Sequence, residues 1–439
     1  MYIPREVEAT IVRELTQGKV VLVTGARQVG KTTTLRHLLG DRYNYVSLEN
    51  PLAYQLAKTD AVLFFSQNAL PLIVDEVQRV PELFSAVKWQ VDESNTRGQV
   101  VLTGSQTYHL MKGVSESLAG RIRVIDMPPL SLREILEGAA AGAVDAASAT
   151  SSVGSQGSPG GISVSCKGFG SGGFVPTLPG AGDKASGTGR FKPEGFDLWQ
   201  TIHRGSMPEL QDPSVDWDGF YTNYVAAYLE RDVRELLSVK DEVKFYEFMV
   251  ACAARSGSLF NASAVGGEVG VNYKTVQSWL SVLQASNIVR IVRPFSGGAG
   301  RGLGKTPKLF FMDTGLVCHL TRWTSAETLQ HGAAAGHVFE TFVVSEILKS
   351  YLNAGSGIRD VWFYRDSRKR EIDLVIQRDR VLHPVEVKTA GLVRTDAVKN
   401  FQALAGFDGF ELGTGAVVCQ TPKPYLVTEN IQAIPVWEI

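Results

Sequence analysis

The residues best suited to chemistry lie in GARQVGKT at positions 25–32. The spacing fits G-x-x-x-x-G-K-[S/T], a loop whose backbone N–H groups surround phosphate oxygens between a strand and a helix. Lys31 is expected to place its charge on the β- and γ-phosphates, and the Thr32 hydroxyl to ligate Mg²⁺. The loop therefore predicts a site for ATP and Mg²⁺. Its residues are Gly25, Ala26, Arg27, Gln28, Val29, Gly30, Lys31, Thr32 and Thr33.

An acidic pair, Asp75 and Glu76, ends the apolar run LPLIVDE. Asp75 is predicted to hold the magnesium ion through water, and Glu76 to polarise the attacking water. A small-molecule kinase must protect ATP from water, so this glutamate favours hydrolysis. An isolated acidic pair would more simply cap a turn, but the phosphate loop upstream favours the catalytic interpretation.

Two further positions are candidates for contacts with the nucleotide. Ser105, in TGSQ, follows an apolar strand and is expected to sense the γ-phosphate. Arg121, in SLAGR, precedes the next strand, where an arginine can reach the nucleotide of a neighbouring subunit and stabilise the transition state. Arg121 thus predicts a homo-oligomer. A solvated surface arginine is the alternative, and both interpretations stay open.

A second group of charged residues lies near the carboxyl terminus. Glu340 falls in the helical pattern GHVFETFVVSEIL, Asp373 in the strand REIDLVI, and Glu386 and Lys388 in the strand PVEVKT. Alternation places Glu386 and Lys388 on one face, and a hairpin would bring Asp373 to them.

Two carboxylates can hold Mg²⁺ while a lysine steadies the attacking water. Glu340, Asp373 and Glu386 are therefore predicted metal ligands, and Asp373, Glu386 and Lys388 predicted catalytic residues. A half-exposed strand or a buried structural ion cluster would give the same pattern, so nuclease activity stays open.

Buried strands are expected to position the phosphate loop. Apolar runs at 20–24, 45–48, 70–76, 99–103 and 122–127 alternate with helical stretches, which predicts a parallel sheet with helices on both faces. Residues 138–196 then change to Gly, Ala and Ser, which predicts a disordered insertion. The predicted parts are a P-loop core at 1–137, the insertion at 138–196, a helical lid-like region at 197–258, a winged helix-turn-helix at 259–335 and an α/β domain at 336–439.

The winged helix-turn-helix rests on Asn272, a predicted N-cap for the helix YKTVQSWLSVLQAS, and on two strands that would form the wing. Its groove-facing candidates are Asn272, Tyr273, Lys274, Gln277 and Ser278. Basic candidates along the wing are Arg290, Arg293, Arg301, Lys305 and Lys308. Local charge is moderate, so contact with DNA and a packing role between domains both stay open.

Composition narrows the class of protein. The 439 residues carry a formal net charge of −1, so a nucleic-acid site must be a local patch. The four cysteines are far apart in the sequence, which predicts buried or free thiols in a reducing compartment. No run approaches the roughly 20 apolar residues of a membrane helix, and the amino terminus lacks a signal peptide pattern. We therefore expect a cytoplasmic protein without a membrane partner.

The ordered set of motifs resembles the AAA+ superfamily. In particular, it is similar to a prokaryotic group of predicted ATPases that carry a C-terminal domain of unknown function with a restriction-endonuclease-like fold. The matching segments are VVLVTGARQVGKTTTLRHLL, PLIVDEVQRVPELF, VVLTGSQTYHLM, SLAGRIRVIDMPPLSLREIL, HRGSMPEL, YLERDVREL, KLFFMDTGL and FYRDSRKREIDLVI. The insertion at 138–196 departs from the group's pattern.

The resemblance implies an α/β chain with an AAA-type ATPase core, a sensor position and an arginine finger. It also implies a PD-(D/E)XK nuclease constellation at Asp373, Glu386 and Lys388, with Glu340 as the helical glutamate. The expected function is Mg²⁺-dependent ATP hydrolysis coupled to a DNA-associated activity of the C-terminal domain. The alternative is an ATP-dependent regulatory switch without nuclease turnover.

Overall fold

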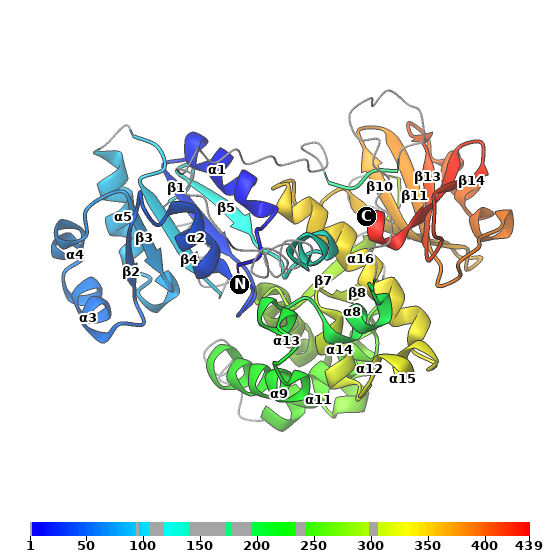
Figure 1. Cartoon of the computed structure of the whole chain (residues 1–439), viewed down its shortest axis with the longest axis horizontal. Helices are drawn as coiled ribbons and strands as arrows, with labels where there is room; N and C mark the ends of the chain where they lie inside the picture. Colours follow the sequence, from blue (N-terminus) through cyan, green and yellow to red (C-terminus); the bar gives the residue numbers. More distant parts are fainter. Residues whose placement is uncertain are drawn as a thin grey trace, which may run out of the picture. The chain divides into compact units, whose positions relative to one another are not determined.

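The structure is a computed structural model that describes residues 2–93, 96–105, 118–139, 173–176, 195–233, 242–297 and 306–439. The chain forms two compact units (Figure 1). Unit 1 comprises Met1–Gly173 and Leu352–Ser356, and unit 2 comprises Phe174–Tyr351 and Gly357–Ile439. Most of the predicted insertion at 138–196 falls outside the described residues.

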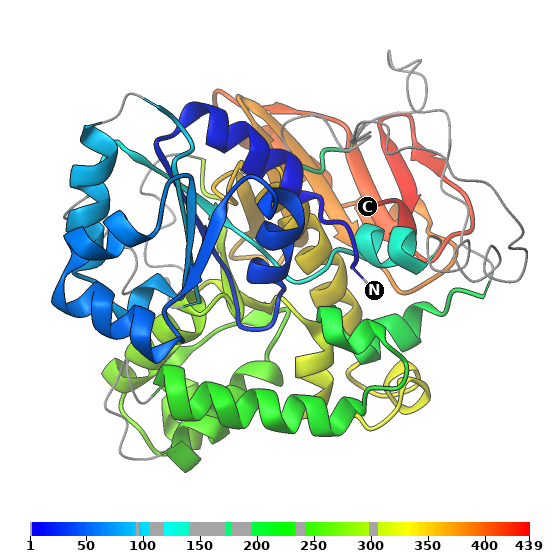
Figure 2. The same cartoon turned by 60° about the vertical axis from the view of Figure 1, so that its left-hand side comes forward.

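Unit 1 contains a parallel sheet, drawn in blue and cyan in Figure 2. In the described part of the unit this sheet has five strands in the order β2-β3-β4-β1-β5, which confirms the predicted parallel α/β core. The strands are β1 (Val20–Thr24), β2 (Asn44–Ser47), β3 (Leu72–Asp75), β4 (Val100–Gly104) and β5 (Ile122–Asp126). Every residue of β1, β3 and β4 is buried, because strands inside a parallel sheet are covered on both faces.

The helices of unit 1 cover this sheet. They are α1 (Val7–Gln17), α2 (Lys31–Leu39), α3 (Pro51–Thr59), α4 (Ala61–Gln67), α5 (Leu83–Asp92) and a helix at 132–139. Phe64, Phe84 and Val87 pack on the buried side chains of β1, β3 and β4. Neither α3 nor α4 was predicted from the sequence, although Asn50 and Asp60 cap them with side-chain hydrogen bonds.

Unit 2 begins with helices. These are α8 (Leu198–Arg204), α9 (Trp217–Tyr228), which continues into a π-helical turn at Leu229–Val233, α11 (Glu242–Ala253), α12 (Ala262–Val269) and α13 (Tyr273–Ala285). Later in the chain come α14 (Thr314–Leu320), α15 (Ala326–Gln330) and α16 (Ala335–Asn353). The Asn272 side chain accepts a hydrogen bond from Thr275 N, which confirms the predicted N-cap of α13.

One mixed sheet runs through unit 2. Among the described residues it has ten strands, in the order β14-β15-β13-β11-β10-β9-β7-β8-β6, with β12 beside β11. Their bounds are β6 (Ser258–Leu259), β7 (Val289–Pro294), β8 (Lys308–Phe311), β9 (Val361–Arg365), β10 (Glu371–Arg378), β11 (Val381–Val387), β12 (Glu411–Leu412), β13 (Gly415–Cys419), β14 (Tyr425–Thr428) and β15 (Ile431–Pro435).

The sheet of unit 2 crosses the predicted domain boundary at residue 335. The expected wing hairpin, β7 and β8, is continuous with the C-terminal strands, because Arg293 and Pro294 of β7 pair in parallel with Trp362 and Phe363 of β9. The edge of β7 thus finds its hydrogen-bond partners in the following domain.

Three of the four cysteines lie in the described parts of the chain. Cys252, Cys318 and Cys419 are buried free thiols, and Cys166 lies outside the described residues. In the part of the chain that the structure describes, no helix is long and apolar enough to cross a membrane.

Candidate functional site

The phosphate loop joins the end of β1 to the start of α2. Gly25 has a φ of 154° and Gly30, the residue before α2, a φ of 93°. A Cβ atom at Gly25 would lie 2.3 Å from the backbone oxygen of Met127, so only glycine fits there. The loop therefore brings successive N–H groups together before a helix amino terminus, which is a favourable place for phosphate.

Lys31 lies inside this loop. Its side chain is largely buried, and its Nζ donates hydrogen bonds to the backbone oxygens of Gly25, at 3.0 Å, and Ala26, at 2.8 Å. The loop thus holds the ammonium group close to its own backbone.

Asp75 connects the phosphate loop with three strands. Its carboxylate accepts hydrogen bonds from Thr32 Oγ1 at 2.9 Å, from the Tyr45 hydroxyl at 2.9 Å and from Thr103 Oγ1. Thr32 and Asp75, both predicted site residues, are therefore in direct contact at the carboxyl edge of the sheet, where β1 leads into the phosphate loop and β3 ends. Sequence reasoning missed Tyr45 and Thr103 as partners of this carboxylate, although both lie in strands that were predicted.

Glu76 follows Asp75 in a left-handed conformation, with a φ of 57°. Burial raises the pKa of its carboxyl group above the usual value, and the nearby Lys31 opposes that shift. The Gln78 side chain donates a hydrogen bond to the same carboxylate. A glutamate with a raised pKa is better suited to accept a proton from water near neutral pH than an ordinary one.

Ser105 lies just after β4, on the same edge of the sheet as Gly25 and Asp75. It is 3% exposed, and its Oγ has no hydrogen-bond partner among the described residues. The structure therefore places a buried hydroxyl near the edge where the phosphate loop begins. Residues 106–117, which follow it, lie outside the described part of the chain.

Arg121 lies at the opposite edge of the sheet. β1 and β5 run parallel, with Val20 beside Ile122 and Thr24 beside Asp126, so Arg121 is at the amino ends of the strands and Gly25 at the carboxyl ends. Five strand residues separate these edges by about 16 Å. Arg121 therefore does not reach the phosphate loop of its own chain.

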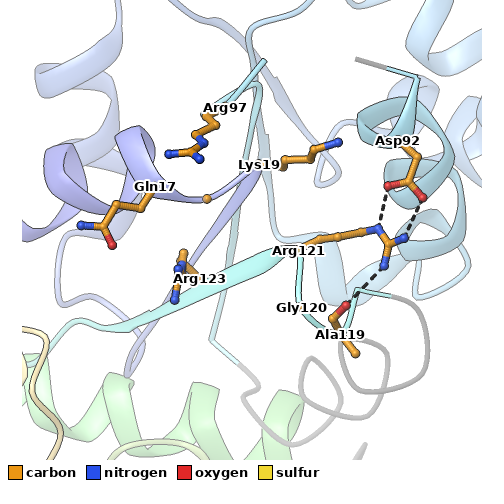
Figure 3. A pocket seen from close by; sticks show the side chains of 9 residues that line it. Gln17, Lys19, Asp92, Arg97, Ala119, Gly120, Arg121 and Arg123 are labelled. Carbon is orange, nitrogen blue, oxygen red and sulfur yellow. Dashed lines mark hydrogen bonds and ion pairs between the residues drawn. The ribbon is translucent and has the colours of Figure 1, made fainter. Parts of the chain in front are cut away.

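The Arg121 guanidinium instead forms a two-bond ion pair with Asp92 (Figure 3). The distances are 2.6 Å from Nε to Oδ1 and 3.0 Å from Nη2 to Oδ2. The pair lines a cavity of about 540 Å³ together with three other basic residues, Lys19, Arg97 and Arg123. The surroundings of Arg121 are thus rich in positive charge, which suits an anionic partner.

The C-terminal carboxylates meet across a hairpin. β10 and β11 are antiparallel with Leu374 beside Val385, which sets Asp373 opposite Glu386 and confirms the predicted pairing of these strands. Asp373 Oδ2 accepts a hydrogen bond from Val387 N at 2.8 Å. Lys388 Nζ donates to Glu386 Oε1 at 2.7 Å. The structure therefore brings these three predicted side chains together.

Glu340 joins this group through a lysine from another element. Lys308 Nζ, on β8, lies 2.8 Å from Glu340 Oε1, 2.7 Å from Glu371 Oε1 and 3.9 Å from Asp373 Oδ1. The Lys308 side chain is 2% exposed, so its predicted contact with a DNA backbone along the wing is wrong. Glu371 was also missed, although it precedes Asp373 by two residues and alternation places both on one face.

Three carboxyl groups of this cluster have raised pKa values. Burial raises the pKa of Glu340 and of Glu386 to about 7, and the neighbouring Asp373 carboxylate adds to both shifts. Burial also raises the pKa of Asp373. Within the described ranges, no three His, Cys, Asp or Glu side chains are arranged to hold a metal ion. A metal at this site would therefore need ligands besides the protein's carboxylates.

The predicted recognition helix presents an exposed polar surface. Asn272, Tyr273, Lys274, Gln277 and Ser278 are all exposed. On β7, Arg293 is exposed, whereas Arg290 is half-buried and donates to Asn287 Oδ1 at 2.7 Å. The other wing candidates, Arg301 and Lys305, lie outside the described residues. DNA contact by this surface stays a prediction.

Three family models match successive parts of the chain. Residues 17–136 match an AAA domain, residues 195–327 a domain of unknown function (DUF8612) and residues 335–439 another domain of unknown function (DUF4143). Two uncharacterized mycobacterial proteins, Mb2031c of Mycobacterium bovis and Rv2008c of Mycobacterium tuberculosis, are each 24% identical over 99% of this chain and 84% of their own length.

Two solved structures show distant likeness to this chain. The Walker-type ATPase PABY2304 of Pyrococcus abyssi covers 73% of this chain and 96% of its own at 15% identity, with a TM-score of 0.40. The RuvB Holliday junction branch migration motor of Thermotoga maritima covers 66% and 89% at 15% identity, with a TM-score of 0.29. The AAA-domain match, the phosphate loop and the parallel sheet together make the amino-terminal part of this chain a P-loop domain of the AAA type.

Proposed function

We propose that this chain binds ATP with Mg²⁺ at residues 25–32 and hydrolyses it. The observation that carries the proposal is the contact between Thr32 Oγ1 and the Asp75 carboxylate at 2.9 Å. Hydroxyl and carboxylate oxygens are the ligands that Mg²⁺ prefers, and the hydroxyls of Tyr45 and Thr103 orient the carboxylate. The ion would be held by Thr32 and, through water, by Asp75, and would neutralise phosphate charge.

The neighbouring side chains have distinct roles in this proposal. Lys31 exchanges the backbone oxygens of Gly25 and Ala26 for phosphate oxygens when the nucleotide binds. Glu76, whose pKa is raised by burial, orients the attacking water and accepts its proton. The buried Ser105 hydroxyl hydrogen-bonds the γ-phosphate from β4. Phosphate release from ATP by the purified chain tests the proposal; release that is no faster than the blank, or that is unchanged by removing Mg²⁺, would refute it.

We further propose that the chain forms a homo-oligomer in which Arg121 contacts the nucleotide of a neighbouring copy. Because it lies at the amino edge of the sheet, its guanidinium can serve only the nucleotide of another copy. Its ion pair with Asp92 is solvent-exposed, and such pairs exchange partners readily. We therefore expect Arg121→Ala to lower ATP turnover while leaving thermal stability and nucleotide affinity of the separate protomer unchanged.

Mixing two inactive variants tests this role. Arg121→Ala keeps an intact phosphate loop, and Lys31→Ala keeps Arg121, so an equimolar mixture should regain part of the turnover that each variant lacks. Size measurement with a non-hydrolysable ATP analogue should show assembly. A strict monomer under these conditions, or a mixture as inactive as its components, would argue against an arginine acting between subunits.

For unit 2 we propose a metal-dependent, DNA-associated activity controlled by the nucleotide. Asp373 and Glu386 face each other across the β10–β11 hairpin, and Lys388 contacts Glu386, which supports a nuclease-like arrangement. Mg²⁺ would be held by these carboxylates together with a substrate phosphate. The exposed face of α13 would hold the duplex.

Cleavage assays separate this activity from the alternative, a regulatory switch without nuclease turnover. With Mg²⁺ or Mn²⁺ and ATP, wild type should cut duplex DNA and Asp373→Ala should not, while both hydrolyse ATP equally. If the wild type cuts neither DNA nor RNA, and Asp373→Ala is indistinguishable from it, the switch describes the protein better.

A further inference from the structure

Lys308 lies among the carboxylates of unit 2, and this location was not predicted from the sequence. It comes from β8, outside the α16, β9, β10 and β11 segment that carries the acidic residues. Its Nζ is within 2.8 Å of Glu340 and 2.7 Å of Glu371, distances typical of charge-assisted hydrogen bonds. The ammonium also lies 5.6 Å from the centre of the Phe363 ring.

We propose that the Lys308 ammonium takes the place of a second divalent cation, so that this cluster binds one metal ion per chain. The inference rests on the metal-dependent function proposed for unit 2 and concerns how many ions that site accepts. Two-metal sites hold their ions about 3.5–4 Å apart between shared carboxylates. Here the space between Glu340, Glu371 and the near oxygen of Asp373 is filled by an ammonium group.

The charges of the cluster support one ion rather than two. The carboxylates of Glu340, Glu371, Asp373 and Glu386 face three cations, which are Lys308, Lys388 and Arg365; Arg365 Nη1 lies 2.7 Å from Glu371 Oε2. With every group ionised, these residues leave a charge of −1, so one divalent ion would bring the cluster to +1 and a second would bring it to +3 in a buried place. Lys308 is 2% exposed, so moving it would leave buried carboxylates unpaired.

Glu386 supplies the open ligand, on the strand that pairs with the strand of Asp373. Glu386 is 8% exposed, and its Oε2 is buried without a hydrogen-bond partner in the described parts of the chain. Cross-strand pairing sets this side chain opposite Asp373. Two carboxylates with water or phosphate oxygens are a sufficient ligand set for Mg²⁺ or Mn²⁺. The single ion therefore binds between Asp373 and Glu386, while the Lys308 ammonium stays with Glu340 and Glu371, 3.9 Å from Asp373 Oδ1.

Counting bound Mn²⁺ tests the inference on the full chain without nucleotide. Electron paramagnetic resonance of free Mn²⁺ gives the number bound, and Glu386→Gln gives the background from other sites, including Asp75. We expect wild type to bind one ion more than Glu386→Gln. Lys308→Met keeps the length of the side chain and removes the charge, and it should bind two ions more than Glu386→Gln. Lys308→Arg should bind one ion more than Glu386→Gln.

The outcomes separate this inference from the function on which it rests. A wild-type excess of two ions would refute the role of Lys308 and leave the metal-dependent function standing. An excess of zero would refute both. If Lys308→Met is too unstable for its bound ions to be counted, melting temperatures are compared instead. Mn²⁺ should raise the melting temperature of Lys308→Met more than that of wild type, and an equal or smaller rise would contradict the proposal.

Discussion

Replacing Glu76 with glutamine is expected to lower the ATP turnover number by about 10²–10⁴-fold, the usual contribution of a positioned general base. Glutamine keeps the shape and the hydrogen bond with Gln78 but cannot take a proton from water. Thr32, Lys31 and Asp75 remain in place, so the affinity for Mg·ATP should change little. Steady-state phosphate release and binding of a fluorescent ATP analogue measure the two effects separately.

A matched control is available nearby. Glu82→Gln makes the same chemical change at an exposed residue before α5 and should leave turnover at the wild-type rate. Asp373→Ala, in unit 2, should do the same. If Glu76→Gln turns over ATP as fast as Glu82→Gln, another group activates the water, and the proposed role of Glu76 is wrong.

Replacing Asp313 with alanine is expected to destabilise unit 2 by roughly 3–5 kcal/mol, because several buried donors lose one acceptor together. Asp313 is 3% exposed and accepts hydrogen bonds from Ser206 N at 2.7 Å and Leu316 N at 3.2 Å. It also accepts one from the Tyr221 hydroxyl. Burial raises the pKa of that hydroxyl well above its usual value, so it stays a donor.

Urea unfolding followed by tryptophan fluorescence measures this loss, since the Trp217 ring lies 5.7 Å from that of Tyr221. Tyr221→Phe removes only one hydrogen-bond donor and should lower the free energy of unfolding by about 1–2 kcal/mol. Equal effects of the two variants would show that Asp313 does not organise the segment around it.

The sequence was sufficient for the phosphate loop and its sheet. The loop pattern is local, and its glycines are required by the backbone at Gly25 and Gly30. The strands of unit 1 are short apolar runs that must be buried, so their existence and their parallel direction could be predicted. The contacts of Tyr45 and Thr103 with Asp75 could not, because they depend on strand order, which places β4 between β1 and β3.

Unit 2 shows where local pattern is insufficient. In the sequence, Lys308 begins an apolar run after a glycine-rich segment, a position that is typical of a solvated residue. Its burial is caused by Glu340 and Glu371, 32 and 63 residues away, and by the pairing of β7 with β9. Likewise, HRGSMPEL and KLFFMDTGL were recognised as motifs without a role. The structure joins them through Ser206 and Asp313.

Thr32 and Asp75 are proposed to form a magnesium site for ATP bound in the phosphate loop. A crystal structure of the chain with a non-hydrolysable ATP analogue and Mn²⁺ tests it directly, because the anomalous signal locates the ion. We expect the ion to be coordinated by Thr32 Oγ1 and phosphate oxygens, with Asp75 bound through water and Lys31 turned towards the β- and γ-phosphates. An ion away from Thr32, or a nucleotide outside residues 25–32, would contradict it.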